Sequence, residues 1–193
     1  MQHSKIHNRQ SYRLKGYDYS SEGSYFLTMC TYNRLHFFGE IENESMQLNE
    51  LGKIAEHIWN EIPVHFPNFE LDAFIVMPNH VHCILNIVSD TNTSGVGTRL
   101  IASQQNTTNQ NNLENTIGGA TGTFNPMFYQ NVSRVIRWYK GRCSFEMRKI
   151  QPDFKWQSRF YDHIIREYDS YLRIANYINE NPKLWGKDKF NHS

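Results

Sequence analysis

The sequence predicts an α+β fold built on a mainly antiparallel sheet. The first observation is the order of the expected elements, which runs strand, hairpin, helix, two strands, helix, strand, helix. The second is that consecutive strands are twice separated by only a few residues, and such short connections join antiparallel strands. The third is the length of 193 residues, which suits one domain and shows no internal repeat.

The first expected elements are a strand and a hairpin. Residues 1–23 are polar and are expected to lead loosely into the fold. Residues 25–32 are rich in aromatic and β-favouring side chains and predict a strand. Residues 36–41 and 45–48 then predict two short strands of a hairpin, joined by Glu42-Asn43-Glu44.

A helix and two longer strands are expected next. Asn49 can cap the helix, and the apolar residues behind it recur at i, i+3, i+4 and i+7. These apolar residues are Leu51, Ile54, Ala55, Ile58, Trp59 and Ile62. Pro63 and Pro67 are expected to close the helix, because proline cannot donate a backbone hydrogen bond. Residues 69–77 and 80–88 predict a pair of neighbouring strands.

A polar stretch interrupts this pattern at about residues 89–123. Thr, Asn, Ser, Gln and Gly dominate it, and its only charged residues are Asp90, Arg99 and Glu114. Such a segment cannot bury enough apolar surface to offset the entropy lost on ordering. We therefore expect a flexible insertion inside a single domain that spans residues 1–193.

The C-terminal part of the sequence predicts a helix, then a strand, then a second helix. Order is expected to resume near residue 126, with a helix that ends at about residue 149. Its expected inner face is Val132, Val135, Ile136, Tyr139 and Cys143, and basic side chains at Arg134, Arg137, Lys140 and Arg142 occupy much of the remainder. A strand at residues 160–166 and a helix at residues 169–181 follow, and Pro182 ends the helix.

Composition excludes several classes of protein. Lys and Arg number 20 against 19 Asp and Glu, so any basic surface for nucleic acid must be local. The three cysteines are far apart and form no CxxC pair, which argues against a structural zinc site or a disulfide framework. The polar N-terminus lacks the apolar region of a signal peptide, and no apolar run is long enough for a membrane helix. We expect a soluble, cytoplasmic protein.

His80 and His82 are the first candidates for chemistry. They lie two residues apart on an expected strand, so both imidazoles point to one face while Val81, Cys83 and Leu85 point to the other. Paired imidazoles on one face can bind a divalent metal ion. The HExxH pattern of zinc proteases and the cysteines of zinc deaminases are absent, so a third ligand must come from elsewhere.

Tyr177 and Asn181 form a second candidate pair. They lie four residues apart on the last expected helix and therefore share one of its faces. A tyrosine hydroxyl, with a pKa of about 10, is a poor nucleophile unless a metal ion polarises its target. Asn181 could supply the missing oxygen ligand. Tyr171 and Tyr139 compete with Tyr177 for the role of nucleophile, and Asn181 before a proline could simply end a helix.

Several segments together resemble one family. The segment FIVMPNHVH at residues 74–82 resembles the histidine–hydrophobic–histidine (HUH) motif of single-tyrosine transposases, and residues 23–34 resemble their first strand. Residues 132–140, the block WQSRFYDHIIR at residues 156–166, and the segment YINENP at residues 177–182 resemble one branch, the transposases associated with repetitive extragenic palindromes (REPs).

This resemblance implies a fold, a chemistry and a ligand set. It implies a ferredoxin-like sheet with helices packed on one side. By position it makes His80 and His82 metal ligands, Tyr177 the nucleophile and Asn181 the third ligand, where other members often have glutamine. The implied substrate is single-stranded DNA folded into a hairpin. The implied reaction needs Mg²⁺ or Mn²⁺ and forms a 5′-phosphotyrosine and a free 3′-OH. Members act as monomers or as homodimers that exchange the tyrosine helix.

DNA contacts are expected from basic and aromatic side chains, because hairpin binding combines phosphate contacts with base stacking. The candidates are Arg134, Arg137, Lys140, Trp156, Gln157 and Arg159. The basic N-terminal residues Lys5, Arg9, Arg13 and Lys15 are further candidates on charge alone. Alternatively, the arginines form a solvated helix face and Trp156 belongs to the core.

The sequence is compatible with three functions. The leading hypothesis is a metal-dependent enzyme that nicks and rejoins hairpin DNA through a phosphotyrosine. A second is a domesticated protein that binds DNA hairpins without turnover. A third is a metallohydrolase of small phosphoesters that uses His80 and His82 but forms no tyrosine adduct.

Overall fold

A four-stranded antiparallel sheet is the centre of the molecule. The computed structural model describes residues 17–88 and 131–191. The sheet has the order β4-β5-β1-β6, with every neighbouring pair antiparallel. Its strands are Gly23–Cys30 (β1), Phe69–Met77 (β4), His80–Ile87 (β5) and Tyr161–Ile165 (β6). The order of these strands and the helices between them is the predicted ferredoxin-like arrangement, so the fold class is confirmed.

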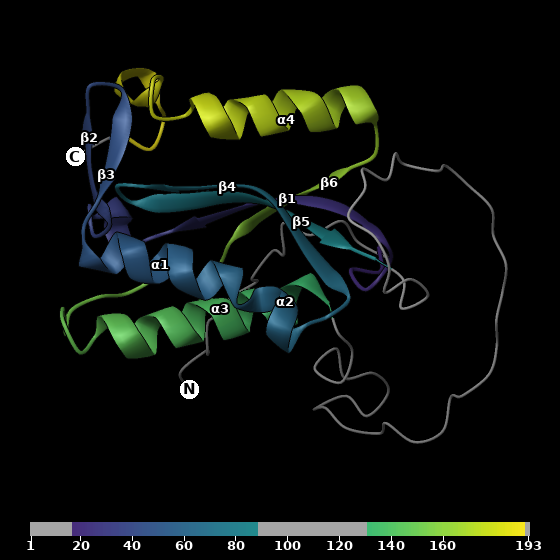
Figure 1. The fold of residues 1–193 in the computed structure, drawn as a ribbon, viewed down its shortest axis with the longest axis horizontal. Coiled ribbons are helices and arrows are strands. Elements are labelled where there is room, and N and C mark those ends of the chain that lie inside the picture. The colour runs from purple at the N-terminus through teal and green to yellow at the C-terminus, as the bar shows by residue number, and fades with distance from the viewer. Residues whose placement is uncertain (1–16, 89–130, 192–193) are drawn as a thin grey trace, which may run out of the picture.

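Helices cover both faces of this sheet, but unequally (Figure 1). The helices are Glu50–Asn60 (α1), Ile62–His65 (α2), Val132–Met147 (α3) and Tyr168–Glu180 (α4). Figure 1 shows α1, α2 and α3 below the sheet, as predicted for one layer of helices, and α4 alone across the upper face. The large core lies on the side of α1 and α3, and a smaller cluster of Ile84, Ile165 and Ile178 lies beneath α4.

Local sequence signals explain where the helices begin. The side chain of Asn49 accepts a hydrogen bond from Gly52 N at 3.0 Å and caps α1, as predicted. Asn131 caps α3 in the same way, through Arg134 N. The expectation that Pro63 closes the first helix was wrong, because it lies in the first turn of α2, where a missing N–H costs nothing.

A short hairpin lies outside the main sheet. Its strands are Gly39–Glu42 (β2) and Ser45–Leu48 (β3), so the first begins later than predicted. The turn residues Asn43 and Glu44 have φ values of 48° and 60°, which matches the twist of a two-residue hairpin turn. Gly39 has a φ of 134°, and a Cβ there would collide with the backbone carbonyl of Gln47.

The remaining predictions concern the polar insertion, the basic N-terminal residues, the cysteines and membrane helices. The predicted insertion at residues 89–123 and the basic residues Lys5, Arg9, Arg13 and Lys15 lie outside the described residues. All three cysteines are free and buried. Within residues 17–88 and 131–191, no helix is both long and apolar enough to cross a membrane.

Candidate metal and tyrosine site

The two histidines lie on the face of the sheet that α4 covers. β5 is buried on both faces: Val81, Cys83 and Leu85 belong to the main core, as predicted, and His80 and His82 point the other way. The two imidazole centroids are 4.4 Å apart. The period-two alternation of a strand therefore places both rings side by side, and the prediction that they share one face of the strand is confirmed.

Asn79, in the turn between β4 and β5, fixes the protonation of His80. Its amide nitrogen donates to the carbonyls of Phe190 and Arg34, at 2.8 Å and 3.0 Å, so its amide oxygen is turned toward His80. His80 Nδ1 lies 2.8 Å from that oxygen and must carry the proton that it donates. The lone pair of His80 Nε2 is then free, and this buried atom has no hydrogen-bond partner.

His82 is held between β1 and α4. Its Nδ1 shares a hydrogen bond of 2.9 Å with the hydroxyl of Thr28, which faces it from the neighbouring strand. Its Nε2 lies 3.3 Å from the hydroxyl of Tyr177 on α4. This polar partner on Nδ1 orients the ring, as the second nitrogen of a metal-binding histidine usually requires.

Burial keeps both imidazoles uncharged at neutral pH. Burial, with the nearby positive charge of Lys189, lowers the pKa of His82 to about 3. Burial, with His82, Arg34 and Lys189, lowers the pKa of His80 well below its ordinary value. Neutral imidazole is the form that ligates metal, so protons do not compete with a cation here near pH 7.

Of the three candidate tyrosines, the structure brings only Tyr177 to the histidines. Tyr139 is buried in the core below the opposite face of the sheet, where its hydroxyl donates to the carbonyl of Ala55 at 3.1 Å. Tyr171 lies on α4, and its hydroxyl contacts the carboxylate of Asp72. The hydroxyl of Tyr177 lies beside His82, and the residue as a whole is 36% exposed. Burial raises the pKa of Tyr177, although the nearby Asn181 amide opposes this rise.

Asn181 ends α4 one turn beyond Tyr177. Its side chain is completely buried. Its amide lies near enough to the Tyr177 hydroxyl to lower the pKa of that group, but neither the amide oxygen nor the amide nitrogen has the geometry of a hydrogen bond to any partner. A buried amide without partners is unfavourable by about 1–3 kcal/mol, so this side chain fits a site in which the oxygen has a cation to bind.

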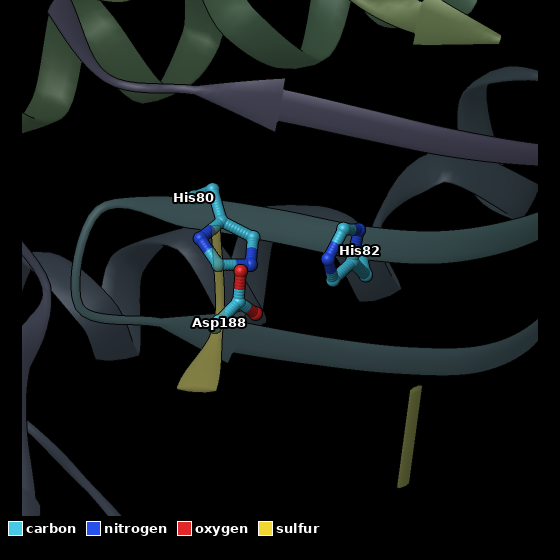
Figure 2. Close-up of side chains that lie close together, drawn as sticks. All are labelled: His80, His82 and Asp188. Atoms are coloured by element: carbon cyan, nitrogen blue, oxygen red, sulfur yellow. The ribbon is translucent and has the colours of Figure 1, made fainter. Parts of the chain in front are cut away.

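Asp188 is a candidate ligand that sequence reasoning missed. Figure 2 shows its carboxylate beside the two imidazoles, on the segment after α4. Ligand atoms of His80, His82 and Asp188 all lie within 4.8 Å of one another. No periodic pattern marks Asp188, because it lies in an irregular segment after the 3₁₀ turn Trp185–Lys187. Imidazole nitrogens with carboxylate and amide oxygens fit a divalent cation.

The predicted DNA contacts fall into two groups. Arg134 and Arg137 lie on the exposed side of α3, on the face of the sheet away from the histidines. Lys140 also lies on α3, but its ammonium donates to the carbonyls of Gln157 and Arg159. It is partly buried, and burial lowers its pKa to about 8. The structure therefore joins Lys140 to the 157–159 segment and leaves the two arginines apart from the site.

Trp156 and Gln157 line a groove beside the site. Trp156 packs against the aromatic core, with its centroid 5.3 Å from that of Phe38, and is only partly exposed. The groove, of about 630 Å³, is lined by Tyr32, Asn33, Arg34, Trp156, Gln157 and Ser158. The Arg34 guanidinium also lies 4.9 Å from the Phe190 ring centroid, and that ring covers His80, so the groove adjoins the histidines. The sequence did not single out Tyr32, Arg34 or Thr28.

Comparisons with known proteins agree with this fold. No protein-family model matches the chain. An uncharacterized protein of Haemophilus influenzae is 38% identical over 186 residues, which cover 95% of this chain and 93% of that protein. Among solved structures, the REP-associated tyrosine transposase bound to a REP hairpin aligns with a TM-score of 0.55 and 19% identity, over 93% of this chain and 77% of that one. At that identity the likeness shows a shared fold, and the resemblance expected from the sequence is confirmed to that extent. The chain therefore belongs to the same family as the Haemophilus influenzae protein and has the fold of the REP-associated tyrosine transposases.

Proposed function

We propose that this protein is a metal-dependent enzyme that nicks and rejoins single-stranded hairpin DNA through a covalent bond to Tyr177. One observation carries the proposal: the Tyr177 hydroxyl lies 3.3 Å from Nε2 of His82, beside a second buried imidazole whose Nε2 has no partner. A nucleophile and a metal-binding pair in such proximity suit phosphoryl transfer.

The expected reaction is an exchange of phosphodiester bonds. The Tyr177 oxygen attacks the scissile phosphorus, and the bond from phosphorus to the 3′ oxygen of the upstream nucleotide breaks. The tyrosine loses its proton and the departing 3′ oxygen gains one, which leaves a 5′-phosphotyrosine and a 3′-OH. Attack of a 3′-OH on that phosphotyrosine reverses the exchange, so rejoining requires no external energy source.

A cation would lessen the main obstacle to this attack. Burial raises the pKa of Tyr177, so the hydroxyl is protonated at neutral pH and is a weak nucleophile. His80, His82 and the amide oxygen of Asn181 would hold Mg²⁺ or Mn²⁺, which would supply positive charge to the phosphate oxygens. His80 and His82 need no deprotonation to bind it, and Thr28 and Asn79 keep their rings oriented.

Hairpin DNA would contact the groove and nearby basic residues. Arg34 and the exposed ring of Tyr32 can bind a phosphate and stack on an unpaired base, beside Gln157 and the edge of Trp156. Arg134, Arg137, Lys140 and Arg159 are proposed as further contacts, and those on α3 would need DNA that reaches around the edge of the sheet. The solved transposase that shares this fold was bound to a REP hairpin, which supports this class of substrate.

We also propose how the protein assembles and where it acts. It would act as a monomer or as a homodimer that exchanges α4, because either arrangement would bring Tyr177 to a His82. An enzyme that acts on chromosomal palindromes would work in the cytoplasm.

The decisive experiment is a search for covalent adducts. The full chain is incubated with a pool of single-stranded hairpin DNAs and Mn²⁺, and adducted strands are separated by denaturing electrophoresis and sequenced. We expect adducts with the wild-type protein and with Tyr168→Phe, a control on the exposed side of α4, and none with Tyr177→Phe. Normal adduct yield from Tyr177→Phe would refute the assignment of the nucleophile.

Two other outcomes would favour the other hypotheses. Tight hairpin binding without cleavage in either Mg²⁺ or Mn²⁺ would indicate a DNA-binding protein without turnover. Hydrolysis of small phosphoesters that survives Tyr177→Phe would indicate a metallohydrolase.

A further inference from the structure

The C-terminal segment, residues 183–191, covers the two histidines. The ring of Phe190 lies with its centroid 4.5 Å from that of His80 and 5.8 Å from that of His82. The centroid of the Trp185 ring lies 6.0 Å from that of His80. Phe26 and Tyr177, whose ring centroids each lie 5.3 Å from that of His82, complete the cover, so that His80 is 0% and His82 1% exposed. In this arrangement no DNA phosphate can reach either imidazole.

Specific polar contacts hold the segment there. Asn79 donates to the carbonyl of Phe190 at 2.8 Å, and Arg34 donates to the carbonyl of Lys189 at 2.8 Å. The Arg34 guanidinium also packs on the Phe190 ring. These contacts join the segment to the two places that border the site, the β4–β5 turn and the groove.

Asp188 brings a carboxylate to the same point. One of its oxygens accepts a hydrogen bond from Phe190 N at 2.8 Å, which leaves the second oxygen for another partner. Because Nδ1 of His80 donates to Asn79, the unpartnered Nε2 of His80 offers a lone pair, and not a proton, to this carboxylate. The free lone pair of His80 Nε2, a ring nitrogen of His82 and a carboxylate oxygen of Asp188 thus lie within 4.8 Å of one another, which is an arrangement that a shared cation can occupy.

We propose that Asp188 is a ligand of the metal ion in the DNA-free protein, so that the bound metal holds residues 183–191 closed over His80 and His82. This inference rests on the proposed function for its metal ion but adds a ligand and a conformational step. In the closed state, the carboxylate of Asp188 occupies a coordination position that a DNA phosphate needs. DNA must therefore displace Asp188 and the covering ring of Phe190, while Asn181 remains as the oxygen ligand during catalysis.

The first test measures metal affinity without DNA. Mn²⁺ binding to the full chain is titrated by electron paramagnetic resonance or calorimetry for the wild type, Asp188→Asn and Asp153→Asn. Asparagine at position 188 keeps an oxygen that can accept the hydrogen bond from Phe190 N but removes the negative charge. Asp153, an exposed acidic residue that precedes β6, is the matched control. We expect Asp188→Asn to weaken Mn²⁺ binding at least about tenfold, since ligand charge sets affinity strongly, and Asp153→Asn to leave it unchanged.

The second test measures closure. Hydrogen–deuterium exchange of residues 184–191 is followed with Mn²⁺ and with EDTA. Mn²⁺ should slow exchange in this segment in the wild type and in Asp153→Asn, and should have little effect in Asp188→Asn. At saturating Mn²⁺, Asp188→Asn should form DNA adducts at least as fast as the wild type, because DNA no longer has a carboxylate to displace.

The outcomes separate this inference from the proposed function. Equal Mn²⁺ affinity in wild type and Asp188→Asn, or no Mn²⁺ binding by the wild type, would overturn the role of Asp188. Weakened adduct formation by Asp188→Asn at saturating metal would overturn the closed-state role and make Asp188 a ligand needed for catalysis. Failure to form any adduct, with the affinity and exchange results as expected, would reject only the nicking activity.

Discussion

Acidification should destabilise the metal-free protein through its buried histidines. A histidine whose folded pKa lies below its unfolded value binds a proton more readily in the unfolded state. Its contribution to stability is therefore complete above the unfolded pKa, about 6.5, and is lost as the pH falls toward the folded pKa. His82, with a folded pKa of about 3, meets this condition over the whole range from pH 6.5 to 3. His80 is shifted in the same direction.

The size of the effect follows from the two pKa values of His82. At pH 5.5 the unfolded imidazole is about nine-tenths protonated and the folded one remains neutral, which corresponds to a loss of about 1.4 kcal/mol relative to pH 7.5. At pH 5.0 the loss from this residue rises to about 2 kcal/mol. His80 should add to both values.

Urea denaturation in EDTA at pH 7.5, 5.5 and 5.0 measures this directly. The comparison is between the wild type and His82→Gln, which removes one titrating group but keeps a polar side chain that Thr28 can bond. His82→Gln should be less stable at pH 7.5, yet its loss of stability down to pH 5.5 should be smaller by about 1.4 kcal/mol. Identical pH dependence in the two proteins would show that His82 is not held neutral by burial.

Three further predictions test other parts of the structure. Arg134→Gln and Arg137→Gln should each reduce the slope of log affinity against log salt by about 0.7, the value for one contact with single-stranded DNA, in fluorescence anisotropy with a hairpin oligonucleotide; an unchanged slope would exclude that arginine from the interface. Thr28→Val should weaken Mn²⁺ binding about tenfold in calorimetry, because His82 loses its orienting partner, whereas Thr28→Ser should bind normally. Gly39→Ala should lower the free energy of unfolding in urea by about 1–3 kcal/mol, and a stability equal to wild type would mean that the β2–β3 hairpin can relax around a Cβ.

The sequence predicted the parts of the site that depend on local periodicity. Alternation along β5 was enough to place His80 and His82 on one face and Val81 and Cys83 on the other. The four-residue spacing on α4 was enough to put Tyr177 and Asn181 on one face of that helix. These relations depend only on backbone geometry within one element.

Contacts between side chains of different helices, strands and loops could not be derived from local periodicity. The approach of Tyr177 to His82 depends on how α4 packs across the sheet, and only the family resemblance suggested it. Asp188 reaches the site because Asn79 and Arg34 hold backbone carbonyls of an irregular segment, and no spacing rule encodes such contacts. The charge of Arg134, likewise, indicated a basic helix face but not the side of the sheet on which that face lies.

The double burial of β5 has a consequence for how this family can change during evolution. Inserting or deleting one residue within His80–Ile87 would exchange the two faces of the strand, so that imidazoles would enter the apolar core and Val81 would face Tyr177. A substitution in this strand changes one side chain, whereas an insertion or deletion of one residue changes the face of every side chain that follows it. Insertions and deletions should therefore accumulate after residue 88, where the polar stretch of the sequence begins, and the spacing from Met77 to Ile87 should be constant among active homologues.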